Sequence, residues 1–77
     1  MKAYYVSEYS ILVLNKKGKM RSLYTPFRAQ CYQAVGNIPA QAWVYIDAVY
    51  QDKTDRLLYL VGANRHPYWC FRLQIQF

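Results

Sequence analysis

Few side chains in this sequence are of a type that could carry out covalent chemistry. His66 is the single histidine, and Cys31 and Cys70 are the two cysteines. Nucleophilic catalysis by a thiol needs a histidine within hydrogen-bond reach to take the proton. The spacing of these three residues does not indicate that they meet. His66 precedes a proline in a segment of turn composition, so we expect it to be exposed in a loop.

The four acidic residues suit structural roles better than acid–base catalysis or metal binding. Asp52 and Asp55 lie in a polar break typical of a turn, where carboxylates accept hydrogen bonds from nearby backbone amides. Asp47 lies within a strand-like run, where we expect it to pair with an arginine on a neighbouring strand. The sequence lacks the closely spaced cysteine pairs of zinc sites, and Gly18-Lys19 lacks the other residues of a phosphate-binding loop. We therefore expect no enzymatic activity, no metal and no cofactor.

Positive charge is concentrated in the first half of the chain. The formal net charge is +6, and the sequence has no acidic residue between Tyr9 and Ile46. The basic residues of this half, which we predict to contact nucleic acid, are Lys16, Lys17, Lys19, Arg21 and Arg28. Such a surface attracts phosphate-rich or acidic partners. The alternative interpretation of the lysine cluster is a solvated turn that discourages edge-to-edge strand pairing.

Aromatic side chains are more numerous than one buried sheet face requires. Nine tyrosines, three phenylalanines and two tryptophans occur in 77 residues. The candidates for an exposed aromatic surface are Trp43, Tyr45, Tyr59 and Tyr68. Aromatic rings on a small β-domain can stack on nucleic-acid bases while lysine and arginine follow the backbone. The alternative is that the N-terminal strands cover this surface, since monomers rarely leave a large apolar patch open.

The elements that must position these residues are short strands joined by turns. A chain of this length forms one domain with a thin core. The first strand candidates are residues 3–6, running into or bending before residues 9–14, and residues 19–25 are their predicted partner. Asn15 suits the first position of a type I turn and Gly18 the fourth, so the sequence predicts a hairpin turn between these strands.

Residues 25–36 permit two interpretations. Thr25 and Pro26 could begin a short helix that ends at Gly36. The alternation of apolar and polar residues over positions 27–32 fits a strand equally well. We favour the strand because the flanking segments are β.

Residues 42–50 and 56–62 form the best-defined hairpin. A polar break over residues 51–55 separates two runs of β-branched and aromatic residues. If Tyr50 and Arg56 close the turn, one face consists of Tyr45, Asp47, Val49, Leu57, Tyr59 and Val61. A slip of one residue would bring Leu58 and Leu60 to that face instead.

The last strand is predicted over residues 68–77, after a loop at residues 63–67. Its inward-facing set is Trp69, Phe71, Leu73, Ile75 and Phe77. Together the elements predict an all-β fold, with one short helix at most, in which five or six strands form a small antiparallel barrel or a strongly bent sheet. We expect a single barrel-like domain over residues 1–77.

This plan resembles the small SH3-like barrels in its architecture. Short strands, a tight late hairpin and an aromatic-rich last strand carry the resemblance, which covers most of the chain. The sequence lacks the acidic loop and the ligand-groove pattern of SH3 domains. The resemblance therefore implies a fold and no ligand.

The N-terminal residues do not have the uninterrupted apolar run of a signal peptide, and the sequence has no apolar run long enough to span a membrane. We therefore expect a cytoplasmic protein with no membrane partner. In that compartment Cys31 and Cys70 should be reduced and buried as small hydrophobic residues.

These observations favour a small, basic, non-enzymatic binding module. Nucleic acid is the first candidate partner, because a basic first half coincides with a surplus of aromatic rings. The alternative is a protein-interaction module, a homodimer or an accessory subunit. It would use the spare aromatic sheet face near Trp43, Tyr45 and Asp47, since tryptophan, tyrosine and arginine dominate the energetics of protein interfaces.

Overall fold

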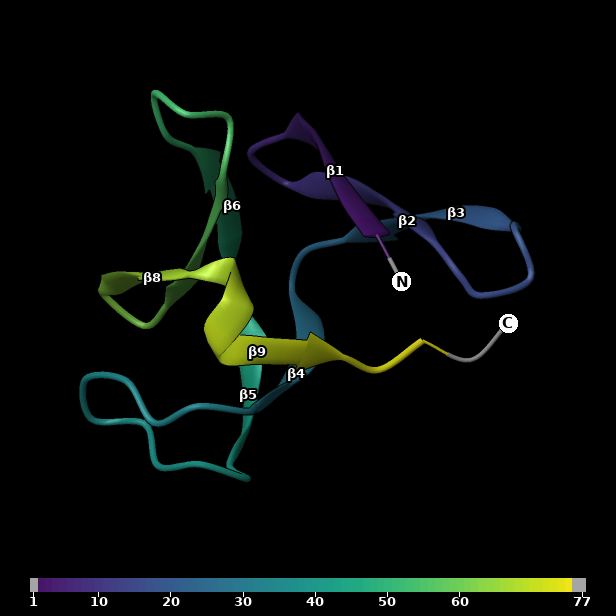
Figure 1. Ribbon diagram of the computed structural model, residues 1–77. Coiled ribbons are helices and arrows are strands. Elements are labelled where there is room, and N and C mark those ends of the chain that lie inside the picture. The colour runs from purple at the N-terminus through teal and green to yellow at the C-terminus, as the bar shows by residue number, and fades with distance from the viewer. Residues whose placement is uncertain (1, 76–77) are drawn as a thin grey trace.

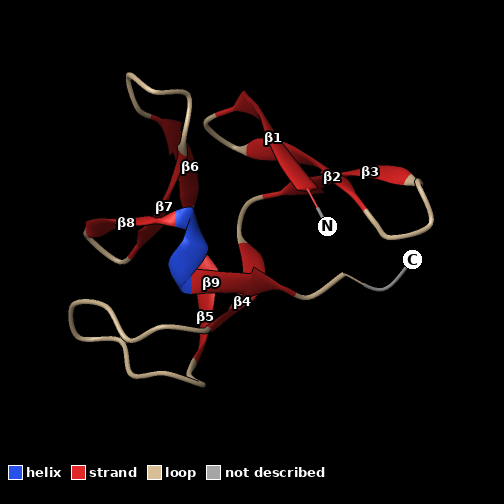
Figure 2. Ribbon diagram, in the orientation of Figure 1, coloured by secondary structure: helices blue, strands red, loops and turns tan. Residues whose placement is uncertain are grey.

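The computed structural model describes residues 2–75, which form three small antiparallel sheets of three strands each (Figures 1 and 2). The first sheet, on the right of Figure 1, contains β1 (Lys2–Ser7), β2 (Ser10–Leu14) and β3 (Met20–Tyr24). The second sheet, in the order β5-β4-β9, contains β4 (Phe27–Cys31), β5 (Trp43–Ile46) and β9 (Phe71–Leu73). The third contains β6 (Ala48–Gln51), β7 (Leu57–Val61) and β8 (Asn64–Pro67).

The all-β prediction is confirmed, but the strands are more numerous and shorter than predicted. Nine strands are present in residues 2–75, instead of five or six, because residues 3–14 and 42–50 each divide into two strands and residues 64–67 add another. The only helical element in this range is a single 3₁₀ turn, η1 (Tyr68–Cys70). The described strands pair into three separate sheets and do not close into a barrel. Among residues 2–75, no helix has the length and hydrophobicity that a membrane span requires.

The first hairpin turn forms where Asn15 and Gly18 predict it. The Gly18 amide donates to the Asn15 carbonyl at 3.1 Å, and Gly18 has a φ of 85°, which favours glycine. The Asn15 side-chain oxygen accepts the amides of Lys17 and Lys19 at 2.9 and 3.0 Å. A second tight turn, at Glu8 and Tyr9, separates β1 from β2, so the N-terminal candidates form a hairpin rather than one strand.

The segment that follows is a strand, as favoured, and not a helix. Phe27, Ala29 and Cys31 of β4 are buried, while the residues between them face outward. The loop after β4 turns at Gly36 and returns through an isolated bridge between Val35 and Ile38. It leads into β5, which pairs with β4 in an antiparallel register.

The predicted strand over residues 42–50 breaks at Asp47, where the chain passes from the second sheet to the third. Ala48 and Val49 are both buried, so inward-outward alternation fails and a single flat strand cannot bury both side chains on one face. The Asp47 amide donates to the Leu60 carbonyl at 2.8 Å, and its carboxylate accepts the Gly62 amide at 3.2 Å. These bonds hold the corner.

The register of the β6–β7 hairpin keeps the predicted faces. Val49 lies opposite Tyr59 rather than opposite Leu57, so the register differs from Tyr50–Arg56 closure by two positions. A shift of two keeps Val49, Leu57, Tyr59 and Val61 on one face and excludes the one-residue slip. Tyr45, predicted on the same face, is instead exposed on β5 of the second sheet, because the strand breaks at Asp47. Asp52 organises the turn, accepting the Arg56 amide at 3.0 Å and both the amide and the hydroxyl of Thr54. These hydrogen bonds, that of the Thr54 hydroxyl first, lower the pKa of Asp52.

The C-terminal third differs most from its prediction. Residues 64–67, predicted as a loop, form β8, and residues 68–70, predicted as strand, form the 3₁₀ turn. The chain must leave the third sheet to reach β4 of the second, and the 3₁₀ turn makes this corner. Trp69 is consequently 48% exposed and not part of the core. Phe71 and Leu73 do face inward and Ile75 packs on the core, whereas Phe77 lies outside the described residues.

His66 is also placed differently from the expectation of an exposed loop residue. It lies on β8 opposite Tyr59 and is only 8% exposed. Its ring lies 6.2 Å from the ring of Phe71, centroid to centroid. A side-chain Cβ at Gly36 would lie 3.1 Å from His66 Cε1.

One core joins the three sheets. Tyr59 of β7 packs edge-on against Phe27 of β4, with ring centroids 5.9 Å apart, and against Phe71 of β9 at 6.0 Å. The Val49 amide of β6 donates to the Glu8 carbonyl at 2.7 Å, which ties the third sheet to the first. Cys31 and Cys70 are buried and free, as predicted.

The contact between Gly36 and His66 predicts a stability difference between two glycine variants. Gly36 and Gly62 both have positive φ, 55° and 63°, but a methyl group on the Gly62 Cα would have no neighbour within 4 Å. We expect Gly36→Ala to lower the free energy of unfolding by about 2–3 kcal/mol and Gly62→Ala by about 1–2 kcal/mol. Chemical denaturation measures both losses. Equal losses would contradict the packing of His66 against residue 36.

The buried thiols predict slow alkylation. Burial, with the nearby Cys31 thiol, raises the pKa of Cys70, so less reactive thiolate is present at any given pH. We expect iodoacetamide near pH 8 to modify Cys70 at least about a hundredfold more slowly in the folded protein than in denaturant. Mass spectrometry of the time course measures the two rates. Comparable rates would show that Cys70 is accessible in the folded state.

Candidate functional site

The second sheet exposes one face that combines arginine with aromatic residues. Inward-facing positions of β4, β5 and β9 contribute to the core, so alternate positions face outward. The register places Arg28 directly opposite Tyr45, and Gln30 between Trp43 and Arg72. We call this surface, extended by the residue after β4, the arginine–aromatic face; it comprises Arg28, Gln30, Tyr32, Trp43, Tyr45 and Arg72.

Two cation–π pairs order this face. The Arg28 guanidinium carbon lies 4.2 Å from the centroid of the Trp43 ring, and that of Arg72 lies 4.1 Å from the Tyr32 ring. Each such pair contributes about 0.5–1 kcal/mol at an exposed site. A stacked guanidinium uses its flat face for the ring and keeps N–H donors at its edge for a partner.

The electrostatics of the face favour an anion. None of the residues that form β4, β5 and β9 is acidic. The Glu8 carboxylate accepts the Tyr50 hydroxyl at 3.0 Å at the joint between the first and third sheets, and Asp52 is occupied within its own turn. Asp47 stands at the end of β5 with its carboxylate on the Gly62 amide. The guanidinium groups of Arg28 and Arg72 thus lie next to aromatic rings, on strands that contain no acidic residue.

The basic residues predicted to act together are divided between two parts of the molecule. Lys16, Lys17 and Lys19 are exposed at the tip of the β2–β3 hairpin, and Arg21 lies on β3. Figure 1 shows this hairpin tip at the right edge of the molecule, away from β5. Of the five predicted cations, only Arg28 therefore belongs to the arginine–aromatic face.

The four aromatic candidates also separate. Trp43 and Tyr45 are exposed on the face, at 46% and 61%. Tyr68 is exposed on η1, edge-on to Trp69 with ring centroids 5.5 Å apart. The prediction of a surface position for Tyr59 is wrong: its side chain is 2% exposed, because it lies at the centre of the core between Phe27 and Phe71.

Three residues of the face, Gln30, Tyr32 and Arg72, were not among the predicted site residues. Tyr32 and Arg72 occupy the polar phase of the alternations over residues 27–32 and 68–77, which placed them outward. Their meeting depends on the pairing of β9 with β4, between Ala29–Leu73 and Cys31–Phe71, which joins segments far apart in the chain. The sequence therefore indicated that Tyr32 and Arg72 are exposed, but it did not indicate that they lie close together.

Other polar groups are arranged for structure. Arg65 lies 3.9 Å from the Tyr50 ring, and the hydrogen bond from the Tyr50 hydroxyl to Glu8, followed by burial, raises the pKa of Tyr50. In the part of the chain that the structure describes, histidine, cysteine and acidic side chains form no group of three that could hold a metal ion.

No protein-family model, no curated protein and no solved structure matches this chain. The class of partner must therefore follow from the chemistry of the face itself. Exposed rings beside guanidinium groups can stack on planar bases and contact phosphates at the same time.

Proposed function

We propose that this protein is a small, basic, non-enzymatic module that binds single-stranded nucleic acid on its arginine–aromatic face. The observation that carries the proposal is the Arg28–Trp43 stack, 4.2 Å from guanidinium carbon to ring centroid, beside the exposed Tyr45. Bases stack on aromatic rings and on guanidinium planes, and arginine edges donate to phosphate oxygens. The face offers aromatic rings and arginine side chains next to one another, because the pairing of β4 with β5 places them side by side.

The lysine hairpin has a separate role in this proposal. Lys16, Lys17 and Lys19 contribute to the formal net charge of +6 but lie away from the face. Charges at such a distance attract a polyanion and raise its rate of encounter, without fixing its position. Bound nucleic acid is positioned by Arg28 and Arg72.

The proposal includes two further points. The first is that the three sheets around one core are an opened form of a small SH3-like barrel; it is supported by the antiparallel pairing within each sheet, although β1 and β9 do not pair. A cytoplasmic location is supported by the two free cysteines, since reducing compartments keep thiols unpaired.

A protein partner is the second candidate, and the same face favours it. Tryptophan, tyrosine and arginine are the residues that contribute most at protein interfaces. In addition, β3 is an edge strand of the first sheet and exposes Met20 and Tyr24. A second copy or another chain could pair along such an edge.

The two tryptophans provide a matched test of base stacking. Both are about half exposed, and each lies near an arginine, Trp43 near Arg28 and Trp69 near Arg56. We expect Trp43→Ala to weaken binding of a single-stranded oligonucleotide by about 5- to 150-fold, since stacking contributes about 1–3 kcal/mol per base. Trp69→Ala should change affinity less than about twofold. Fluorescence anisotropy measures both, with melting curves to verify folding.

Two double variants of equal charge test which cations contact phosphate. Arg28→Gln with Arg72→Gln removes two charges from the face, and Lys16→Gln with Lys17→Gln removes two from the hairpin. We expect the arginine pair to make the slope of log affinity against log salt shallower by about 1.4, or about 0.7 per lost phosphate contact. The lysine pair should leave that slope unchanged.

Three results would contradict the proposal. Binding absent at low salt, or insensitive to salt, would exclude nucleic acid as the partner. A larger change of the salt slope in the lysine double variant than in the arginine double variant would show that nucleic acid contacts the hairpin. Sedimentation showing a dimer that Trp43→Ala dissociates would favour the protein-interaction candidate.

A further inference from the structure

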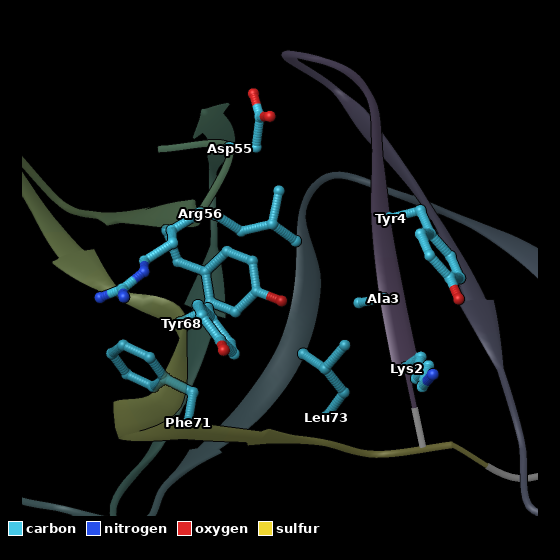
Figure 3. A pocket seen from close by; sticks show the side chains of 10 residues that line it. Lys2, Ala3, Tyr4, Asp55, Arg56, Tyr68, Phe71 and Leu73 are labelled. Atoms are coloured by element: carbon cyan, nitrogen blue, oxygen red, sulfur yellow. The ribbon is translucent and has the colours of Figure 1, made fainter. Parts of the chain in front are cut away.

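A cavity of about 320 Å³ opens between β1 and the segment that contains η1 and β9 (Figure 3). Figure 3 shows Lys2 and Ala3 on one side of it and Tyr68 and Phe71 on the other. Its apolar lining is formed by Ala3, Leu57, Phe71 and Leu73. The cavity lies on the inward side of β9, whereas Arg72 and the arginine–aromatic face lie on the outward side.

The hydroxyl of Tyr59, which has no hydrogen-bond partner among the described residues 2–75, opens into this cavity. Tyr59 lines the cavity and is 2% exposed. In residues 2–75, every side-chain nitrogen or oxygen atom that is completely enclosed has a hydrogen-bond partner. Because the Tyr59 hydroxyl has none in that range, it is not completely enclosed and must reach the cavity. A hydroxyl in this position can donate a hydrogen bond to an acceptor atom of a molecule bound in the cavity.

The Tyr59 hydroxyl is a donor at all physiological pH values. Burial, with a smaller contribution from the neighbouring Tyr68 hydroxyl, raises the pKa of Tyr59. The proton therefore stays on the oxygen, and the group can donate to an anionic oxygen. A matching acceptor would be a carboxylate or a phosphate.

The charge around the cavity also favours an anion. Lys2, Arg56 and Asp55 are the charged residues of the lining. Figure 3 shows the Arg56 guanidinium and the Asp55 carboxylate directed away from Ala3 and Leu73, so Lys2 is the cation best placed to meet a bound anion. The volume is at the lower limit of small-molecule sites, so a ligand must be smaller than a typical drug. The apolar lining requires a hydrophobic body.

We propose that this cavity binds a small organic anion whose flat, apolar body carries a carboxylate or a phosphate. The ring lies against Leu57, Phe71 and Leu73. One anionic oxygen accepts a hydrogen bond from the Tyr59 hydroxyl, and Lys2 neutralises the charge. This site is independent of nucleic-acid binding, because it uses the opposite side of β9.

Titration of the isotope-labelled protein with benzoate, phenyl phosphate and benzamide tests the site. We expect the two anions to shift the amide resonances of Ala3, Leu57 and Phe71 saturably, and neutral benzamide to bind at least about tenfold more weakly. The tighter of the two anions identifies the charged group of the ligand. Equal binding of benzoate and benzamide, or shifts centred on Trp43 and Arg28, would overturn the proposal.

Two tyrosine variants locate the anion. Tyr59→Phe keeps the core ring and removes only the hydroxyl, so we expect about fivefold to tenfold weaker binding of the tighter anion. Tyr24→Phe removes an exposed hydroxyl on β3 and should have no effect. Lys2→Gln, on the exposed β1, tests the charge if Tyr59→Phe does not fold, and should weaken anion binding severalfold. Unchanged affinity in Tyr59→Phe, or in Lys2→Gln, would contradict the site.

Discussion

The structure depends on the burial of Tyr59. Its ring is the point at which β7 meets both β4 and β9, through Phe27 at 5.9 Å and Phe71 at 6.0 Å. In a 77-residue chain the core is thin, and one buried aromatic supplies a large part of the apolar area that holds separate sheets together. The corner at Asp47 and the 3₁₀ turn at residues 68–70 let the chain bring three short sheets around this ring. The geometry of both proposed sites follows from that arrangement.

Burial of one face of the second sheet fixes what the other face can present. Because Phe27, Ala29 and Cys31 face the core, Arg28 and Gln30 must face outward, and the register sets Tyr45, Trp43 and Arg72 beside them. The Arg28–Trp43 and Arg72–Tyr32 stacks restrict the motion of long side chains before any partner binds. A partner then loses less conformational entropy on binding. The inward side of β9 meanwhile lines the cavity, so the same strand serves two different surfaces.

Features set by local sequence were predictable, and features set by pairing between distant segments were not. The Asn15–Gly18 turn, the Asp52 turn and the alternation of β4 depend on neighbouring residues, and all three formed as predicted. The break at Asp47 and the helical turn at Tyr68 arise because the chain must change sheets, which no local pattern encodes. Tyr59 occupies a position that alternation left ambiguous, because both faces of its hairpin are apolar. Of the candidate site, Arg28, Trp43 and Tyr45 could be selected from the sequence. Arg72 could not, because its proximity results from the β4–β9 pairing.

The central claim is that nucleic acid binds the arginine–aromatic face rather than the lysine hairpin. The most direct measurement is a titration of the isotope-labelled protein with a short single-stranded oligonucleotide, followed through backbone amide and arginine side-chain resonances. We predict that the largest shifts occur at Arg28, Trp43, Tyr45 and Arg72, with small changes at residues 16–19. Shifts concentrated at residues 16–19, or a spectrum that does not change at low salt, would contradict the account.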